Sequence, residues 1–163
     1  MTMNRARARR LLARFPDQRV LVVGDLMLDH YIQGNVTRIS PEAPVPVLHV
    51  NQERSVPGGA SNVASNVRAM SGAADVAGVV GRDAHGQSLT RLLARDGVGV
   101  EAVLRLPHVP TTVKTRVVAD RQQVVRVDWE KQLEFTDRQL AQFCQQVEKM
   151  AAQATAVVIE DYS

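Results

Sequence analysis

Three short runs of apolar residues recur along the chain, separated by longer stretches of mixed polarity. The first covers residues 20–23 and ends at Gly24, and the second covers residues 76–80 and ends at Gly81. The third, residues 156–159, reads Ala-Val-Val-Ile. A fully apolar run of four or five residues is typical of a strand that is buried on both faces, as in a parallel sheet.

Helical patterns occupy the stretches between these runs. Residues 62–70 place two valines and a methionine on one face, and residues 85–96 gather three leucines just before Gly97, a common helix terminator. Thr136 and Gln139 have the spacing of a capping box, and apolar residues follow them at helical spacing. Strands that alternate with such helices predict an α/β fold, with a parallel sheet covered by helices on both faces.

Two stretches break the alternation. Residues 32–50 contain three prolines, which exclude a helix and favour an edge strand or an extended segment. Residues 112–128 form two partly alternating strands around the polar residues 120–123, which predicts an antiparallel hairpin with one exposed or ligand-facing side. Residues 1–163 are therefore predicted to belong to one domain, in which an α/β core carries a small β lid made from these two segments.

Composition fits a folded domain. Hydrophobic residues make up 45% of the 163 positions and charged residues 23%, which argues against disorder. The apolar runs are too short for a membrane helix, so no membrane partner is expected. The single cysteine, Cys144, excludes an internal disulfide framework and fits a reducing, cytoplasmic compartment. The four histidines are scattered without ligand spacing, so no metal site is predicted.

The net charge of +3 is unevenly distributed. Six arginines and one aspartate give the first twenty residues a charge of +5, which leaves −2 for the rest. An arginine-rich start is compatible with nucleic-acid contact or with a targeting peptide. The favoured interpretation is an amphipathic first helix with Leu11, Leu12 and Phe15 on its apolar side, and no nucleic-acid partner is predicted.

The stretch PGGASNVASN, residues 57–66, places two glycines directly before a predicted helix. Gly58 and Gly59 allow a ligand to approach the backbone without meeting a Cβ atom, and the first turn of the helix directs free N–H groups at it. Asn62 in that turn can donate and accept hydrogen bonds, which suits a sugar hydroxyl. The alternative is a plain turn into a helix, and the residues alone favour that alternative.

Carboxylates follow the first predicted strand, in the segment GDLMLD. Ligands of open α/β sheets bind beyond the carboxyl ends of the strands, so Asp29 can accept hydrogen bonds from vicinal hydroxyls there. A turn-capping role for Asp25 or Asp29 fits the spacing equally well. The sequence contains neither a G-x-x-x-x-G-K-[ST] motif nor a G-x-G-x-x-G motif, which argues against a P-loop or dinucleotide-binding protein.

Five motifs in order carry a resemblance to a known family. They are GDLMLDHY, RISPEAPVPV, PGGASNVASNV, GRDAHG and TVKTRV, within residues 20–128. In this order they resemble the amino-terminal half of PfkB-family, ribokinase-like carbohydrate kinases. RISPEAPVPV after the GDLMLD segment further resembles the heptose 7-phosphate kinase domain of bacterial ADP-heptose synthesis. The resemblance implies a ribokinase-like fold with a β lid, through which members of this family commonly form a dimer.

The resemblance also implies roles for individual residues. Asp29, Gly58, Gly59 and Asn62 match family positions that hold sugar hydroxyls. The lid cations Arg38, Lys114 and Arg116 are candidates for holding the phosphate already present on the substrate, since an arginine fork binds phosphate oxygens bidentately. Asp128 and Asp161 are further candidates for hydroxyl contacts. Two alternatives remain open: Arg116 as a solvated strand residue, and Asp128 in an ion pair with Arg126 or Arg116.

By this resemblance, the parent reaction is transfer of the ATP γ-phosphoryl group to the anomeric hydroxyl of heptose 7-phosphate, with Mg²⁺. The product leads to ADP-heptose and the lipopolysaccharide core. The family carries its catalytic aspartate in a late Gly-Ala-Gly-Asp motif, which this sequence lacks. The near-match at residues 72–75 is expected to be an ordinary helix-to-strand loop. We therefore expect an incomplete domain, with the catalytic base and ATP site beyond Ser163 and no turnover by the chain alone.

Two other functions remain open. One is a ribokinase-like kinase for a different sugar. The other is a non-catalytic remnant that binds a sugar phosphate or dimerises through its lid. The resemblance places Asp161 in a Ser-Asp-Tyr run of this branch, and the segment Glu160-Asp161-Tyr162 departs from that run at its first position.

Overall fold

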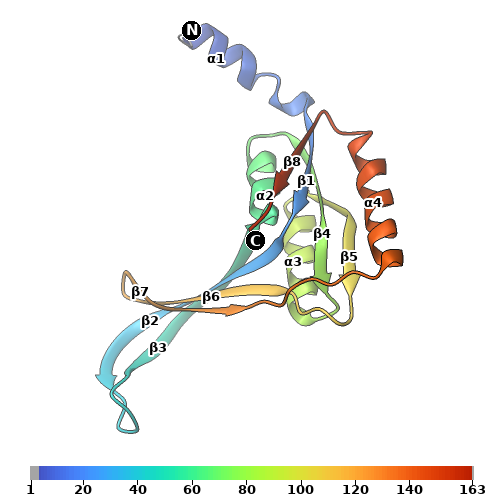
Figure 1. The fold of residues 1–163 in the computed structure, drawn as a ribbon. Coiled ribbons are helices and arrows are strands. Elements are labelled where there is room, and N and C mark those ends of the chain that lie inside the picture. The colour runs from blue at the N-terminus through green and yellow to red at the C-terminus, as the bar shows by residue number, and fades with distance from the viewer. Residues whose placement is uncertain (1–3, 163) are drawn as a thin grey trace.

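The computed structural model describes residues 4–162 as a core sheet flanked by helices, from which a second sheet projects (Figure 1). The helical elements are α1 (Arg5–Leu12), the 3₁₀ turn η1 (Phe15–Asp17), α2 (Ala60–Ala69), α3 (Ala84–Arg95) and α4 (Asp137–Ala151). The strands are β1 (Arg19–Gly24), β2 (Leu26–Ile39), β3 (Pro46–Gly59), β4 (Ala73–Gly81), β5 (Gly99–Leu106), β6 (Thr112–Ala119), β7 (Gln122–Trp129) and β8 (Ala156–Glu160).

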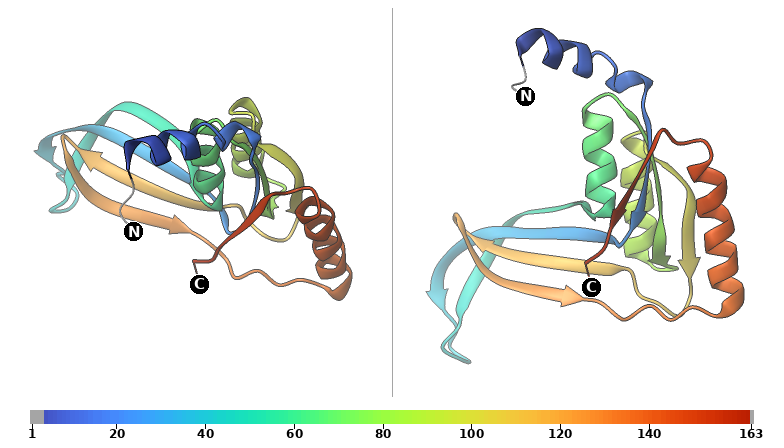
Figure 2. Two further views of the ribbon diagram at one scale, coloured as in Figure 1. Left: turned by 90° about the horizontal axis from the view of Figure 1, so that it is seen from above. Right: turned by 45° about the horizontal axis from the view of Figure 1, so that its top comes forward.

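The core sheet is parallel, with the strand order β5-β4-β1-β8. Helices α2 and α3 cover one face and α4 covers the other (Figure 2). This arrangement confirms the predicted α/β architecture. The three predicted apolar strands are β1, β4 and β8, but β8 is not buried as expected, because it forms an edge of the core sheet and its residues Val157, Val158 and Ile159 are exposed. Strand β5 was not predicted, because Glu101 and Arg105 interrupt its apolar residues and only one of its faces is well buried.

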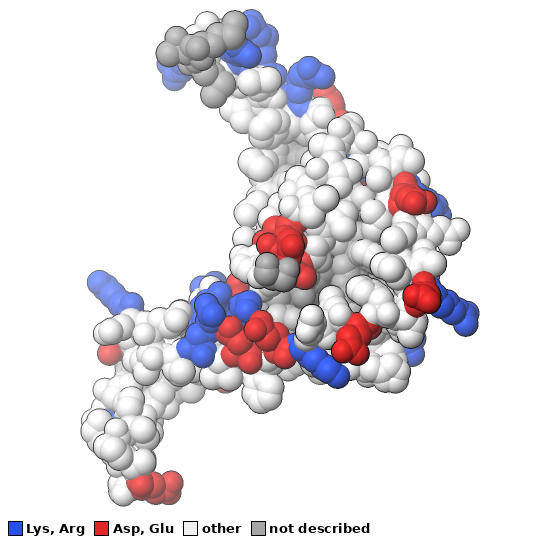
Figure 3. All heavy atoms as spheres, in the orientation of Figure 1, with Lys and Arg blue, Asp and Glu red and all other residues white. Residues whose placement is uncertain are grey.

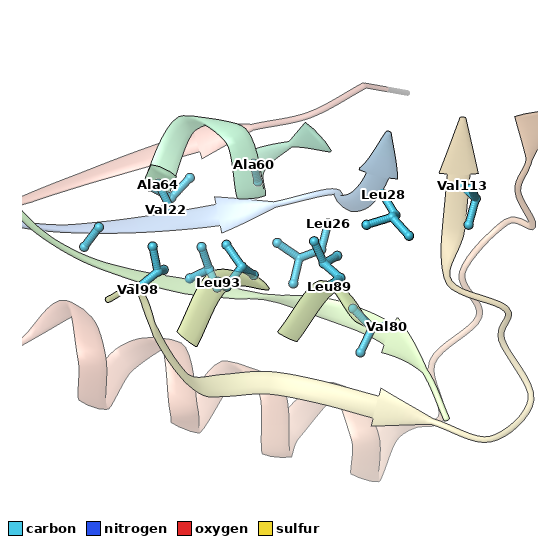
Figure 4. Close-up of a cluster of buried hydrophobic side chains, with 12 residues drawn as sticks. Val22, Leu26, Leu28, Ala60, Ala64, Val80, Leu89, Leu93, Val98 and Val113 are labelled. Carbon is cyan, nitrogen blue, oxygen red and sulfur yellow. The ribbon is translucent and has the colours of Figure 1, made fainter. Parts of the chain in front are cut away.

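The main hydrophobic cluster lies between the core sheet and helices α2 and α3 (Figure 4). Val22 and Val76 from the sheet meet Leu89 and Leu93 of α3, and all four side chains are fully buried. A smaller cluster on the opposite face packs α4 against Leu21. Close packing on both faces explains why the central strands read as continuous apolar runs.

Helix ends follow the sequence signals. Thr136 and Gln139 form the predicted capping box, in which Gln139 Oε1 accepts from the Thr136 backbone N–H at 2.9 Å. Gly97 follows α3 with φ +77°, a conformation that glycine adopts without steric cost. The predicted amphipathic first helix is α1, but Leu11 and Leu12 are 47% and 59% exposed, so no neighbour among the described residues covers that apolar side.

The second sheet, called the lid sheet below, has the strand order β3-β2-β6-β7 and projects to one side of the core (Figure 1). Strands β2 and β6 run parallel, whereas β2–β3 and β6–β7 are antiparallel pairs. Its first segment covers residues 26–59 and is longer at both ends than the expected 32–50. The proline-containing strand β3 lies at an edge, as expected of a strand with missing N–H donors. The predicted hairpin is β6–β7, and it turns at residues 120–121.

One local expectation was wrong. Residues 72–75 were expected to form a loop, but β4 begins at Ala73 and continues through Asp75. The Asp75 side chain is buried, and it accepts hydrogen bonds from Arg19 at 2.7 and 3.1 Å. This charged partner on the neighbouring strand explains how a carboxylate fits inside a parallel sheet. Among the described helices, none is long and apolar enough to cross a membrane.

Leu93 provides a test of the main cluster. Its side chain is fully buried beneath α3, so Leu93→Ala removes apolar contacts that cannot be refilled. We expect the free energy of unfolding to fall by about 2–5 kcal/mol. Leu140→Ala on α4 is the matched control, because Leu140 is 48% exposed and its truncation should cost about 0.5 kcal/mol. Equal losses in urea titrations of the two variants would contradict this description of the core.

Candidate functional site

A cleft of about 730 Å³ opens where the lid sheet leaves the core. Its walls are the junction between β1 and β2 at residues 24–27, the cleft-facing side chains of β6 and β7, and residues 130–133. It lies beyond the carboxyl ends of β1 and β4, where open α/β sheets bind ligands. Figure 3 shows basic and acidic side chains side by side in this region.

Strand register brings most of the predicted polar residues onto one face of the lid sheet. Asp29 pairs with Lys114 and Tyr31 pairs with Arg116 across the parallel strands. Lys114 in turn pairs with Asp128 on β7. Because directly paired residues in neighbouring strands point to the same side of a sheet, these side chains share one surface. We call this surface the polar lid face.

Arg116 and Asp29 form the shortest ion pair of the polar lid face. The Arg116 guanidinium donates to Asp29 Oδ1 at 2.6 Å, and the two side chains are only 22% and 19% exposed. This hydrogen bond raises the pKa of Arg116 above its ordinary value, despite partial burial. Tyr31 lies beside them, with Arg116 5.4 Å and Arg54 4.4 Å from its ring centroid. The alternative of Arg116 as a solvated strand residue is therefore wrong.

Lys114 is held between two carboxylates. Its ammonium group lies 3.3 Å from Asp128 and 3.2 Å from Glu130. Burial lowers the pKa of Lys114, but the hydrogen bonds to these two carboxylates outweigh it and leave the pKa raised. Asp128 also accepts from Arg126 at 2.9 Å. Although desolvation raises the pKa of Asp128, the hydrogen bonds from Arg126 and Lys114 outweigh it and lower the pKa.

The glycine pair lies where β3 passes directly into α2. Gly59 has φ +54°, and a Cβ atom there would collide with the Asp25 carbonyl oxygen. A Cβ atom on Gly58 would lie 2.9 Å from Cγ of Asp29 and 3.0 Å from Cγ of Met27. The absence of side chains thus allows the Asp29 carboxylate to lie against the β3 backbone. Asn62 is exposed in the first turn of α2. Contact of these residues with a sugar stays a prediction.

A second acidic group gathers at the carboxyl ends of β1 and β8. Asp25 accepts from the Tyr162 backbone N–H at 2.9 Å, and Glu160 ends β8 beside it. Desolvation, with repulsion from Asp25 and Asp161, raises the pKa of Glu160, whose Oε2 atom is buried without a hydrogen-bond partner. Asp161 is exposed next to it. Within residues 4–162, no group of three or more His, Cys, Asp or Glu side chains is arranged to hold a metal ion.

Arg38 does not join the other predicted site residues. It is exposed near the far end of β2, opposite Val47. Nine residues of strand separate it from Asp29, or roughly 30 Å at the usual rise per residue. Within one chain, Arg38 therefore cannot share a ligand with Lys114 and Arg116.

The ion pair of Asp128 with Arg126, one of the open alternatives, is confirmed. Its signal was the spacing of two residues on a predicted strand, because residues two apart share a face. The sequence reasoning missed Glu130, which contacts Lys114, and Arg54, which stacks on Tyr31. Arg54 gave no such signal, since its partner on β2 depends on the hairpin register.

Comparison with known proteins identifies the family. Residues 17–163 match the family described as pfkB family carbohydrate kinase. The chain belongs to the pfkB family of carbohydrate kinases. It is 47% identical over 151 residues to Bifunctional protein HldE of Azotobacter vinelandii and 44% identical over 151 residues to that of Pseudomonas aeruginosa. Each alignment covers 93% of this chain, but the chain spans only 31% of either relative.

Solved structures show the same fold at low sequence identity. Ribokinase of Arabidopsis thaliana, complexed with ribose and ATP, superposes with a TM-score of 0.60 at 18% identity, covering 87% of this chain and 45% of that chain. An uncharacterized sugar kinase of Pyrococcus horikoshii in complex with ATP gives 0.60 at 16%, covering 86% and 42%. This pfkB chain therefore has the predicted ribokinase-like architecture, and it corresponds to less than half of these neighbours.

The raised pKa of Glu160 makes a signed prediction. Folding disfavours the ionised form of Glu160 and so lowers the free energy of unfolding. This destabilisation is absent below the ordinary pKa of about 4.5, where the carboxyl group is protonated. It develops as the pH rises from that value through the raised pKa. Glu160→Gln should therefore raise the melting temperature at pH 7, and this gain should vanish near pH 4.

The control for this prediction is Glu148→Gln, because Glu148 is exposed on α4. Thermal melts of both variants and the parent chain between pH 4 and 8 provide the comparison. A gain from Glu160→Gln that is the same at both ends of this range would contradict the electrostatic explanation.

Proposed function

We propose that this chain carries the sugar-phosphate site of a kinase that acts on heptose 7-phosphate. The proposal rests on the polar lid face beside the cleft, where Asp29, Lys114 and Arg116 lie on adjacent strands. The specific substrate is inferred from the motif resemblance, above all RISPEAPVPV. The similarity to Bifunctional protein HldE supports it without identifying the sugar.

In this proposal, the assembled enzyme transfers the ATP γ-phosphoryl group to the anomeric hydroxyl, on the route to ADP-heptose and the lipopolysaccharide core. Such transfer depends mainly on positioning and on stabilising charge. ATP and Mg²⁺ are the expected cosubstrate and metal. The described residues do not fit a metal site by themselves, so no step is assigned to the ion here. A cytoplasmic location is also part of the proposal, since ATP and a reducing environment for Cys144 are both found there.

The observed ion pairs suggest how the substrate binds. Arg116 and Lys114 are already neutralised by carboxylates, so a phosphate must compete for them. When Arg116 turns to the phosphate, Asp29 is released to accept hydrogen bonds from the sugar hydroxyls. Gly58 lies against Asp29, and Gly59 and Asn62 follow it at the start of α2; in this proposal they complete this half of the site.

Asp128 and Asp161 are retained as proposed hydroxyl contacts. Both lie near the cleft, Asp128 on its wall and Asp161 next to the lining residue Tyr162. Asp128 is engaged with Arg126 and Lys114 through one bond to each of its oxygens, and each oxygen keeps a further lone pair for a hydroxyl donor. Arg38 can contribute only if the tip of another lid sheet approaches the cleft.

Substitutions of Arg116 test the phosphate role. We expect affinity for heptose 7-phosphate to decrease in the order parent chain, Arg116→Lys, Arg116→Ala. Loss of hydrogen bonds to a charged group should weaken binding by roughly 10- to 100-fold for Arg116→Ala. Isothermal titration calorimetry with the 163-residue chain measures this. Arg121→Ala is the control, since Arg121 is an exposed arginine at the turn of the same hairpin.

Titrations with ribose and fructose 6-phosphate distinguish the other functions. Ribose binding equal to or tighter than heptose 7-phosphate would favour a kinase of another sugar. Unchanged heptose 7-phosphate affinity in Arg116→Ala would overturn the assignment of the phosphate site. Binding of heptose 7-phosphate together with turnover in the assembled protein separates a kinase from a non-catalytic binding protein.

The opposite face of β7 supports the proposed homodimer. Val125, Val127 and Trp129 alternate with the charged residues Arg126 and Asp128, and they are 47%, 40% and 64% exposed. A strip of exposed apolar side chains on a sheet is a feature of protein interfaces.

Trp129 tests the dimer. We expect light scattering to give a dimer mass for the parent chain and a monomer mass for Trp129→Glu, because a buried charge in an apolar interface is costly. Arg121→Glu, at the turn of the hairpin, is the control for charge alone. A monomeric parent chain would contradict the proposal.

A further inference from the structure

The motif GRDAHG, residues 81–86, has no part in the site described so far. It joins the end of β4 to the start of α3, and Asp83 is the N-cap residue of that helix. An N-cap carboxylate usually satisfies only the free N–H groups of its own helix. Here it does more, because it also contacts the segment that leads into the lid sheet.

Asp83 and Thr111 form a compact network of hydrogen bonds. Asp83 accepts from the backbone N–H and the hydroxyl of Thr111, both at 2.8 Å, and from the Gly86 N–H at 2.7 Å. The Thr111 hydroxyl in turn accepts from the Gly81 N–H at 2.9 Å. Thr111 is 2% exposed, so these bonds are shielded from water. We call the Asp83–Thr111 network the lid latch.

Both glycines of the motif make room for the lid latch. A Cβ atom on Gly81 would collide with Oδ2 of Asp83 and would lie 2.8 Å from the Thr111 nitrogen. A Cβ atom on Gly86 would lie 2.7 Å from Oγ1 of Thr111. The G-x-D-x-x-G spacing is thus explained by the lid latch as a whole.

The lid latch lies directly before the first residue of β6. Thr111 directly precedes this strand, and Val113 packs with Leu28 in the main hydrophobic cluster. Lys114 follows Thr111 by three residues and Arg116 by five. The preceding residues 107–111 have no regular secondary structure, and the lid latch connects the end of this segment to the start of α3.

We propose that Asp83 is a positioning residue that, through Thr111, sets the orientation of the lid sheet and thereby places Lys114 and Arg116 for the substrate phosphate. The part that concerns phosphate rests on the proposed function. The part that concerns lid orientation does not, and it can be measured without a ligand.

The charge state of Asp83 is consistent with this role. Desolvation raises the pKa of Asp83, but hydrogen bonds from Gly86 and Thr111, together with nearby His85, outweigh it and leave the pKa lowered. The carboxylate therefore stays ionised at neutral pH and can accept all three hydrogen bonds. Asn in this place would still cap α3, but its amide group cannot accept both bonds from Thr111.

Lid orientation can be measured by pulsed electron paramagnetic resonance between two spin labels. Cys144 is the only cysteine and is exposed on α4, so it accepts one label on the core. Arg121→Cys, at the turn between β6 and β7, accepts the other at the far end of the lid sheet. The distance distribution between the labels reports how firmly the lid sheet is held.

Four substitutions in this labelled background test the lid latch. Thr111→Val and Asp83→Asn should each broaden the distance distribution, and Thr111→Ser should preserve the parent distribution because it retains the hydroxyl. Thr90→Val is the matched control. Thr90 is a buried threonine of α3 whose hydroxyl donates to the Gly86 and Gln87 carbonyls at 2.9 and 3.2 Å rather than to Asp83 or Thr111.

Thr90→Val should lower the melting temperature without changing the distribution. A parent-like distribution in both Thr111→Val and Asp83→Asn would overturn the proposal. Equal broadening of the distance distribution in Thr90→Val would also overturn the proposal, because it would indicate that any buried threonine substitution loosens the fold. Having two lid-latch variants keeps the test decisive if one of them does not fold.

A ligand titration then links the lid latch to phosphate binding. We expect Thr111→Val to weaken binding of heptose 7-phosphate about 10-fold, equivalent to about 1.4 kcal/mol, and Thr111→Ser to restore it. Unchanged affinity despite a broadened distribution would refute the positioning role while leaving the proposed function intact. If the parent chain does not bind the sugar, the proposed function fails, and the distance measurements still decide whether Asp83 orients the lid sheet.

Discussion

The burial of Leu28 and Val113 against the core joins the two sheets of this protein. These side chains come from adjacent lid strands, yet both are almost completely buried in the cluster formed by the core sheet and α3 (Figure 4). Together with Leu26 and Met27, which are also buried at the start of β2, they anchor β2 and β6 where these strands leave the core. The cleft lies at this point, where the lid sheet leaves the core.

Alternation along the lid strands places charged and apolar side chains on opposite faces of the lid sheet. Odd and even residues of a strand face opposite sides, so Lys114 and Arg116 lie on one side while Val113 lies on the other. On β7 the same alternation separates Asp128 from Trp129. One thin sheet can therefore present charges toward the cleft and an apolar strip away from it.

Charge pairing dominates the polar lid face. The short bond between Arg116 and Asp29 and the two carboxylates around Lys114 neutralise cations that would otherwise repel one another. Such pairs contribute modestly to stability when partly exposed to water. In the proposed binding mode, an anionic ligand exchanges with a carboxylate so that the lysine or arginine stays paired, and the displaced carboxylate turns to the sugar hydroxyls.

The sequence by itself determined the alternation of strands and helices, the hairpin of residues 112–128 and the capping signals at Thr136 and Gly97. These features depend on local periodicity and backbone preference, which short windows of sequence contain. The sequence did not reveal β5, because charged residues interrupt the apolar residues of this half-buried strand.

Only the tertiary structure decided which charges meet. Asp29 and Arg116 are 87 residues apart, and their contact depends on the parallel register of β2 and β6. The same register excludes Arg38, which belongs to the same strand as Asp29 but lies many residues further along it. The Asp83–Thr111 contact likewise spans 28 residues. Side-chain partners of this kind are fixed by strand pairing and packing, which act between segments that sequence periodicity treats separately.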